Sequence, residues 1–335
     1  MTLHLHGLGH FHPENRITNA FLESLDIGTS DEWIVERVGI RLRRTVLSLD
    51  YIRQTRNCDS RAAHEASIHT NAEMGARAAE MAITRAGIDK RDIGLVVAGS
   101  SAPDTLSPAE ACTVASALGL EVPCFDVHSA CTSFLAMLYV LSIARSEALP
   151  TFVLAVAAEG MTRTVDYTDR SSAVLWGDAA AAAVVSTRSP GRARIHGAAL
   201  SSSPSGHAKV VVPRAGHFRQ EGRTVQTFAI HKTVQCFQSL WNEFHDGERT
   251  FHFVGHQANL RMLESVCRQC EIPPAHHHSN VEHYGNTAAA GAPSVISMAW
   301  ERWSDRDDVA LVGVGAGLTW GSGLVRFGSP FGGEA

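Results

Sequence analysis

The sequence predicts an α/β fold built from two similar halves, and three observations lead to this fold class. Between residues 88 and 185, short apolar segments alternate with helical stretches, which is typical of a layered fold around a mixed, largely buried sheet. The same alternation resumes after residue 191. In each half, a strand-like segment leads into a helix start that carries a reactive polar residue, Cys131 in the first and Asn286 in the second. This pattern predicts a duplicated fold with a site between its halves.

The first half is expected to span residues 1–189 and the second half residues 190–335. An alternating segment with His4, His6, His10 and His12 predicts an N-terminal strand. The first half should continue with strands at 93–101, 124–130, 151–159 and 179–186 and with helices at 109–118 and 134–146. The second half should contain helices at 224–244, 258–270 and 288–304, strands at 251–256, 308–317 and 318–327, and a polar segment at 279–286.

Residues 48–70 interrupt this alternation with a polar and aromatic stretch. We expect an insertion here that carries its own short helix. Two interpretations remain open: a solvated surface insertion, which is the commoner case, and a lid or wall over a site.

The composition is that of a globular protein, with 44% hydrophobic and 19% charged residues among 335. The net charge is -5, and the charged residues form no long runs of one sign, so the sequence gives no indication of nucleic-acid binding. A basic patch on one face remains compatible with this net charge. We expect neither a signal peptide nor a membrane span. Seven cysteines, an odd number, indicate reduced thiols and a cytoplasmic location.

No metal site is expected, although histidine is abundant. The clusters at 4–12 and 276–278 are read as sources of adventitious metal affinity, the second in a surface loop after two prolines. Cys267 and Cys270 continue a helical pattern and have no second pair at zinc-site spacing.

Cys131 is the first candidate catalytic residue because it lies at a probable helix start. Unpaired N–H groups and the helix dipole stabilise a thiolate there, although a cysteine among alanine and phenylalanine is more often part of a core. His256 and Asn286 each have a comparable alternative, as a buried core histidine and as a helix cap. Together the three residues indicate acyl transfer, in which a thiol attacks, a histidine exchanges protons and an amide polarises a carbonyl.

Six segments resemble motifs of the ketoacyl synthase III family of thiolase-fold condensing enzymes. They are DVHSACTSF, GHQANLRM, YGNTAAAGAPS, GVGAGLTWGSGLVRF, residues 29–41 and residues 169–178. The resemblance extends over nearly the whole chain, and the motifs occur in the same order along it as in the family. The resemblance implies a thiolase-like fold with layers in the order α-β-α-β-α. It also implies a decarboxylative Claisen condensation of an acyl-CoA or other acyl thioester with malonyl-acyl carrier protein, in fatty-acid initiation or a specialised polyketide or lipid pathway.

In this family, Cys131 would carry the acyl group, and the backbone N–H groups of Cys131 and Ala316 would form the oxyanion hole. His256 and Asn286 would stabilise the enolate formed as carbon dioxide leaves. Asn286 also distinguishes this Cys-His-Asn pattern from elongating synthases and degradative thiolases. Two alternatives are an acyltransferase that makes an ester or amide without a carbon–carbon bond, and a silent subunit; the intact triad counts against both.

The resemblance also implies substrate contacts and partners, but no cofactor. Coenzyme A would be held by Trp33, Arg37 and Arg170, with Trp176 and His231 further along the arm, and Arg261 would dock the carrier protein. Leu106 and Ser107 would bound the acyl pocket across a homodimer, and without a bulky aromatic there they would admit a longer or broader acyl group. Trp176, Ala316, His231 and Gln235 replace the residues usual in the family, which leaves substrate choice open and weakens the docking charge.

Overall fold

The computed structural model describes residues 2–328, and its centre is a nine-stranded mixed sheet. The strand order is β11-β12-β13-β8-β1-β7-β6-β4-β5. The strands are β1 (Leu3–Phe11), β4 (Ile93–Gly99), β5 (Cys124–Asp126), β6 (Phe152–Glu159), β7 (Ala179–Ser186), β8 (Ala193–Ser202), β11 (Thr250–Gly255), β12 (Asp307–Gly315) and β13 (Thr319–Phe327).

The strand pairing is repeated in the two parts of this sheet. In the first part β4 runs parallel to β6, β6 antiparallel to β7, and β7 antiparallel to β1. In the second part β11, β12, β13 and β8 follow the same scheme. A single parallel bridge from Phe253 to His277 takes the place that β5 has beside β4. The duplication expected from the sequence is therefore present, and three residue pairs between β1 and β8 join the parts.

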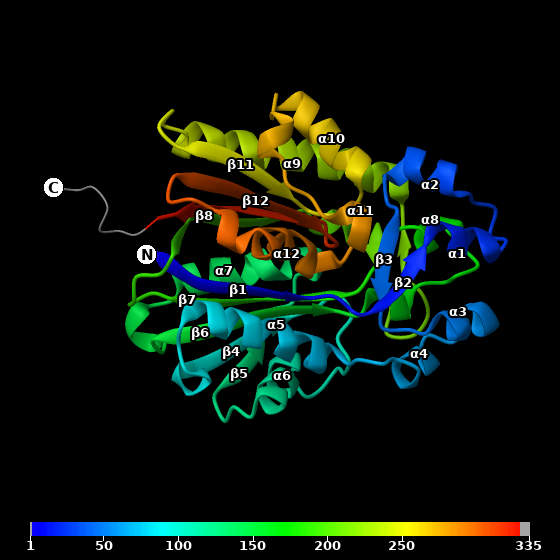
Figure 1. Cartoon of the computed structure of the whole chain (residues 1–335), viewed down its shortest axis with the longest axis horizontal. Coiled ribbons are helices and arrows are strands. Elements are labelled where there is room, and N and C mark those ends of the chain that lie inside the picture. The colour runs from blue at the N-terminus through cyan, green and yellow to red at the C-terminus, as the bar shows by residue number, and fades with distance from the viewer. Residues whose placement is uncertain (1, 329–335) are drawn as a thin grey trace.

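Helices form three layers around the two parts of the sheet (Figure 1). One outer layer is α5 (Asn71–Ala86) and α6 (Glu110–Leu118), and the other is α9 (Gly222–Phe244) and α10 (Leu260–Gln269). Between the two parts lie α7 (Ser133–Ile143) and α12 (Gly291–Met298). The order α-β-α-β-α is the one that the resemblance to ketoacyl synthase III implies.

The middle layer forms because α7 and α12 are apolar on all sides. Most of α7 is buried, and its side chains share one hydrophobic cluster with strands from both parts of the sheet. A helix that is hydrophobic all round belongs in such an interior position. Every residue of β7 is also buried, as expected for a strand that is covered on both faces.

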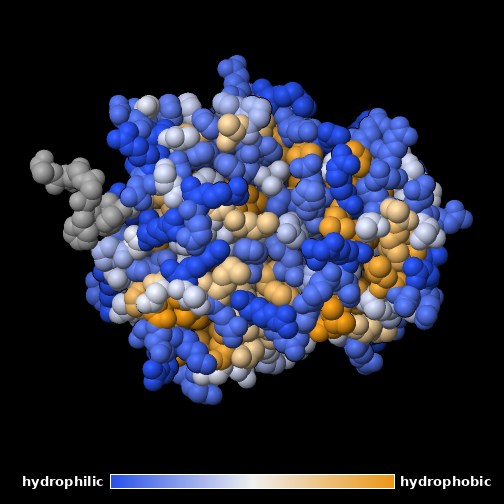
Figure 2. Space-filling model, in the orientation of Figure 1, coloured by the Kyte–Doolittle hydropathy of each residue, from blue (hydrophilic) through white to orange (hydrophobic). Residues whose placement is uncertain are grey.

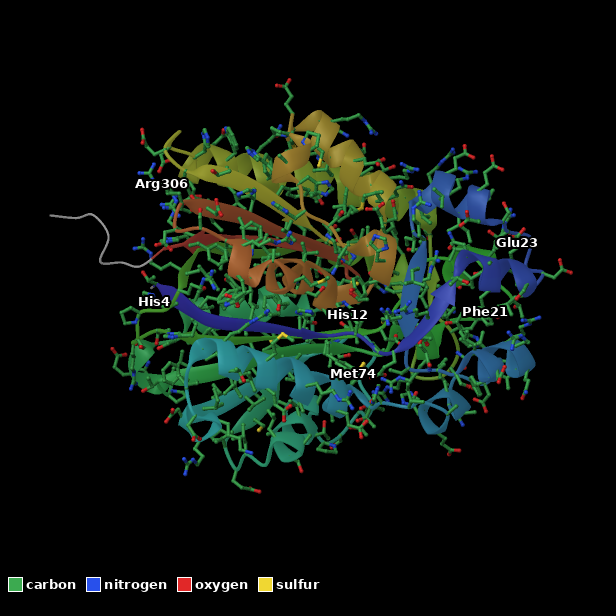
Figure 3. The ribbon with its side chains drawn as sticks, viewed as in Figure 1. His4, His12, Phe21, Glu23, Met74 and Arg306 are labelled. Atoms are coloured by element: carbon green, nitrogen blue, oxygen red, sulfur yellow. The ribbon has the colours of Figure 1, made fainter. Side chains whose placement is uncertain are left out.

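Strand β1 runs from His4, near one end of the molecule, to the turn near His12 at its middle, with Met74 of α5 beside it (Figure 3). Gly7 and Gly9 allow α5 to approach this strand closely. A Cβ atom at these positions would lie 2.1 Å from the Ala82 carbonyl oxygen and 1.9 Å from that of Ala78, respectively. The absence of a side chain there thus determines how tightly the outer layer packs.

Short elements form a cap at one end of the sheet, on the right in Figure 1. They are β2 (Asn15–Thr18), α1 (Asn19–Ser24), α2 (Asp31–Val38), β3 (Leu42–Thr45), α3 (Leu49–Thr55), α4 (Ala62–Glu65), α8 (Arg170–Ala173) and α11 (Val281–Tyr284). The segment 48–70 contains two short helices instead of one. It contacts the body through Asn57, whose Nδ2 donates to the carbonyl oxygens of Arg163 and Val165.

Several details differ from the sequence expectation. Strand β5 ends at Asp126 and not at residue 130, because residues 130–132 form a 3-10 turn, and β2 and β3 were not expected. Residues 288–304 form α12 flanked by two 3-10 turns, Ala288–Ala290 and Trp300–Arg302, because Pro293 has no N–H to extend a helix backwards. Strand β8 was not expected, since its apolar alternation fades after Ile195. His277 and His278 are half-buried beside β11, and so they do not belong to a free surface loop.

The visible face in Figure 2 is mostly hydrophilic, with small apolar patches scattered over it. Among residues 2–328, no helix is both long and apolar enough to cross a membrane.

Candidate active site

Cys131 lies at the N-terminal end of α7, in the 3-10 turn Ala130–Thr132. The turn begins with Ala130 at φ 47°, a left-handed conformation that a residue with a Cβ rarely adopts. Such local strain is typical of functional turns because the surrounding structure has to maintain it. Gly315 on β12 makes room for this turn, since a Cβ there would lie 3.2 Å from Cβ of Cys131.

The structure brings the three predicted catalytic residues to one cavity. Cys131, His256 and Asn286 all line a channel of about 200 Å³. His256 directly follows β11, and Asn286 follows α11, so two chain segments of the second half meet the nucleophile of the first. Further lining comes from Val38 at the end of α2, from Val210 and Phe218, and from the turn between β12 and β13.

Backbone contacts hold Asn286 in a defined orientation. Its N–H donates to the Leu175 carbonyl oxygen at 2.8 Å, and its own carbonyl accepts from Gly177 N–H at 3.0 Å. The side-chain Oδ1 accepts from the backbone N–H of Ala288 at 3.0 Å. With the acceptor thus engaged, the Nδ2 group is the part of the amide left to donate to a substrate.

His256 is neutral at physiological pH. Its side chain is buried, and burial lowers the pKa of the imidazole to about 4. A neutral imidazole can donate from one ring nitrogen and accept at the other, and so it can both stabilise an oxyanion and take up a proton.

The Cys131 thiol is not the activated thiolate that its place at a helix start predicts. Burial, followed by the charge of Glu159, raises the pKa of this thiol to about 12. The Ser101 side chain and the backbone N–H groups of Cys131 and Ala316 act in the opposite direction, as hydrogen-bond donors to the sulfur. The expected lowering of the pKa is therefore wrong, because desolvation outweighs the helix terminus. The backbone N–H groups of Cys131 and Ala316, which the resemblance assigns to the oxyanion hole, are thus among the groups that lower the pKa of this thiol.

Glu159 is a buried carboxyl that the sequence analysis missed. At the end of β6 it accepts hydrogen bonds from the Ser101 N–H at 2.8 Å, from the Ser100 hydroxyl at 3.2 Å and from the Ala289 N–H at 3.2 Å. Burial raises its pKa to about 8. This carboxyl connects the loop after β4 to the turn after Asn286. A glutamate at the end of an all-apolar strand was the available signal.

Trp176 separates the channel from a second cavity beside Cys131. Its backbone forms a parallel bridge with Asn286, and its ring packs edge-on against Phe218 with centroids 4.6 Å apart. Both rings line the channel and also the second cavity, which measures about 220 Å³. Ser101, His128 and Val212 line this second cavity and also a third one that extends to Leu106, His64 and Arg214. His64 belongs to the segment 48–70, which therefore forms part of a cavity wall.

The residues expected to contact coenzyme A only partly meet that expectation. Arg170 and Arg37 lie over the Trp33 ring, with their Cζ atoms 4.8 Å and 5.9 Å from its centroid, so an aromatic and two guanidinium groups do converge. His231 is exposed on α9 and does not line the channel, to which α9 contributes Val225, Gln226, Phe228 and Ala229.

Arg261 and Leu106 also have surroundings that the sequence did not predict. The Arg261 guanidinium donates to the carbonyl oxygens of Val35 and Glu36 and pairs with Glu264 at 3.0 Å, which ties α10 to the end of α2. Leu106 is 73% exposed at the rim of the third cavity. Ser107 beside it is exposed as well, but it does not line that cavity.

Comparison with known proteins agrees with this geometry. Two models of 3-oxoacyl-[acyl-carrier-protein] synthase III match the chain, one over residues 125–204 and the C-terminal one over residues 248–327. A beta-ketoacyl-[acyl-carrier-protein] synthase III of Syntrophomonas wolfei is 33% identical and covers 98% of this chain and 98% of its own. The chain belongs to the 3-oxoacyl-[acyl-carrier-protein] synthase III family.

Solved structures of synthase III enzymes have the same fold as this chain. The enzyme of this name from Aquifex aeolicus superposes with a TM-score of 0.83 at 29% identity, over 97% of this chain and 100% of its own. The priming beta-ketosynthase of the R1128 polyketide pathway superposes with a TM-score of 0.81 at 25% identity, over 98% and 97% of the two chains. The protein is thus a thiolase-fold condensing acyltransferase. Among residues 2–328, no group of three His, Cys, Asp or Glu side chains is arranged to hold a metal ion.

Proposed function

We propose that this enzyme condenses an acyl thioester, delivered by coenzyme A, with malonyl-acyl carrier protein to give a 3-oxoacyl thioester and carbon dioxide. The observation that carries the proposal is the convergence of Cys131, His256 and Asn286 on one channel. The R1128 relative primes a polyketide pathway. The site therefore fits an enzyme that starts either fatty-acid synthesis or polyketide synthesis.

In the first half-reaction, the Cys131 sulfur attacks the thioester carbonyl and coenzyme A leaves. Because the thiol has a pKa of about 12, it loses its proton only as attack proceeds. Neutral His256 in the same channel takes this proton and gives it to the sulfur of coenzyme A as that group leaves, which returns the histidine to its neutral form. The backbone N–H groups of Cys131 and Ala316 stabilise the oxyanion of the tetrahedral intermediate. The acyl group is then stored on sulfur, which divides the condensation into two easier steps.

In the second half-reaction, the malonyl thioester loses carbon dioxide and becomes an enolate. Neutral His256 and the free Nδ2 group of Asn286 both donate to the developing oxyanion, and neither needs to change its charge. The enolate carbon attacks the acyl carbonyl on Cys131, the C–S bond breaks, and the thiol is restored by a proton.

The second cavity beside Cys131 sets the size of the acyl group. It measures about 220 Å³, and a cavity of roughly 150 Å³ is known to hold benzene, so about eight or nine non-hydrogen atoms fit. The third cavity extends this space to Leu106, at a rim that a second copy of the chain would close in a homodimer. A medium-length or branched acyl group is therefore favoured over acetyl.

Trp33 is proposed as the stacking platform for the adenine of coenzyme A. The Arg170 guanidinium, whose Cζ lies 4.8 Å from the ring centroid, would move away from the ring to let the adenine enter between them. Replacing Trp33 with alanine should raise KM for acyl-CoA about tenfold and leave kcat nearly unchanged, because stacking on an aromatic is worth roughly 1–3 kcal/mol and acts far from the reacting atoms. Steady-state kinetics against acyl-CoA and against the same acyl group on pantetheine measure this. A pantetheine substrate that loses as much as acyl-CoA would remove the adenine assignment.

Intact-protein mass spectrometry tests the proposed function most directly. The enzyme is incubated with a panel of acyl-CoAs from acetyl to decanoyl, and one acyl adduct per chain should form on the wild type. Malonyl-acyl carrier protein is then added, whereupon the adduct should disappear as 3-oxoacyl-carrier protein and carbon dioxide appear. Transfer of the acyl group to an alcohol or amine without carbon dioxide release would establish the alternative acyltransferase. A strong optimum at acetyl would contradict the size of the second cavity.

A further inference from the structure

Glu159 is a buried carboxyl that the proposed chemistry does not use. It is fully buried at the end of β6, a strand that is otherwise apolar. Its Oε2 and Oε1 atoms accept from the Ser101 N–H at 2.8 Å and 3.0 Å, and the Ser101 hydroxyl lies 3.1 Å from Oε1. The carboxyl is therefore bonded to both the backbone and the side chain of Ser101.

The Ser101 hydroxyl lies between Glu159 and the Cys131 sulfur. It donates to that sulfur, and both residues line the second cavity. One hydroxyl has one proton, so it cannot donate to the carboxyl and to the sulfur at once. When Glu159 is neutral, its O–H donates to the serine oxygen and the serine O–H donates to a thiolate. When Glu159 is a carboxylate, it accepts from the serine and the thiol donates to the serine. The two arrangements differ only in whether Glu159 or the sulfur holds the proton.

The second half-reaction needs a proton at this sulfur. The malonyl carboxylate leaves as carbon dioxide, so the substrates supply no proton when the C–S bond breaks, and His256 keeps its neutral form while it donates to the enolate. Burial raises the pKa of Glu159 to about 8, so this carboxyl is mostly neutral at pH 7. Because the pKa of the Cys131 thiol is about 12, transfer of a proton from Glu159 to the thiolate is favourable.

We propose that Glu159 and Ser101 form a relay that returns the proton to the Cys131 sulfur as the acyl–sulfur bond breaks. This inference rests on the proposed function. The electron pair of the C–S bond stays on sulfur and binds the Ser101 hydroxyl proton, while the serine oxygen takes the carboxyl proton of Glu159. Ser101 therefore touches the reacting atom, and Glu159 acts through Ser101.

Solvent that enters two cavities can restore the proton of Glu159. Ser101 lines both the second and the third cavity. Part of the wall of the second cavity is β9 (Val210–Val211), which pairs in antiparallel fashion with β10 (Arg219–Gln220). One proton per turnover enters by this route, which equals the one proton that each condensation consumes.

Three other titratable or charged groups lie near Glu159. Cys131 faces it from the 3-10 turn before α7, and Glu110 lies at the start of α6. Arg163 lies in the 3-10 turn after β6 and pairs with Asp104 at 2.7 Å, so its charge is compensated. Burial raises the pKa of Glu110 to about 8 as well, which makes it the group to be distinguished from Glu159.

The pH dependence of the second half-reaction tests the relay. The acyl-enzyme is formed from acyl-CoA, free coenzyme A is removed, and malonyl-acyl carrier protein is added. Rapid quench then measures the 3-oxoacyl product of a single turnover. Because only neutral Glu159 has a proton to give, the wild-type rate should fall about tenfold from pH 7 to pH 9.

In Ser101→Ala, the rate of this step at pH 7 should fall about 10²-fold, the usual contribution of a general acid, and it should no longer fall between pH 7 and pH 9. Glu159→Gln should have the same two effects. Acylation of Cys131 by acyl-CoA should stay within a few fold of the wild type in both variants, because that step uses His256. Ser101→Thr keeps a hydroxyl and should recover both the rate and its pH dependence.

Glu110→Gln is the matched control, since it removes a buried carboxyl of similar pKa that is bonded to Asn71 Nδ2 and to the Asp104 N–H. It should keep the tenfold fall between pH 7 and pH 9. If Glu159→Gln fails to fold by thermal unfolding, Ser101→Ala still decides, because it leaves the carboxyl in place.

Three outcomes would overturn the relay. They are a pH dependence that persists in Ser101→Ala, an equal loss of acylation, and loss of the pH dependence in Glu110→Gln. A wild type that forms no 3-oxoacyl product at any pH would instead refute the proposed function.

Discussion

Replacing Cys131 with alanine should abolish acyl-enzyme formation and lower the rate of condensation by at least 10⁴-fold, because removal of the nucleophile leaves only substrate binding and the oxyanion donors. His256 and Asn286 remain in the channel of this variant. Decarboxylation of malonyl-acyl carrier protein should therefore continue, with the resulting acetyl-carrier protein as its product. Mass spectrometry of the intact protein reads the first effect, and release of labelled carbon dioxide reads the second.

Cys112→Ala is the matched control for this prediction. Cys112 is an exposed thiol on α6 and does not line the channel, so its removal should leave both the acyl adduct and the rate intact. An adduct that survives in Cys131→Ala but disappears in Cys112→Ala would move the nucleophile out of the channel and remove the basis of the proposed mechanism.

The sequence predicted the layered fold well because periodicity reports burial. The apolar strands ending near Ser101 and Glu159 lie within two residues of their expected ends, since strands covered on both faces must be apolar throughout. Strand β8 was missed for the same reason, because its outer half is exposed and its pattern is weak. Pairing across the sheet, such as the bridge from Phe253 to His277, has no signature in the local sequence.

The sequence predicted the three catalytic residues of the site well, but it predicted the surroundings of these residues less well. Motifs identified Cys131, His256 and Asn286, which do share one channel. The pKa of the Cys131 thiol was predicted in the wrong direction because the helix start is visible in the sequence, whereas its desolvation and the nearby Glu159 depend on tertiary packing. The internal bonds of Arg261 likewise depend on how α10 packs against α2, and no spacing along the chain reveals them.

Asn286→Asp should separate the two half-reactions. The aspartate is nearly isosteric with asparagine and keeps the oxygen that accepts from Ala288 N–H, so the turn should remain folded. It loses the Nδ2 donor and places a negative charge where the enolate oxygen develops. Decarboxylation of malonyl-acyl carrier protein should fall at least 10²–10³-fold, which is the usual cost of removing one oxyanion donor.

Acylation of Cys131 in Asn286→Asp should remain within a few fold of the wild type, because its oxyanion is held by the backbone N–H groups of Cys131 and Ala316. Rapid-quench measurement of coenzyme A release reads this step alone. Asn286→Ala should show the same separation with a smaller loss of decarboxylation, since it removes the donor without adding a charge. If both steps fell equally, Asn286 would serve mainly to shape the channel beside Trp176, to which its backbone is bridged, and the enolate would depend on His256 alone.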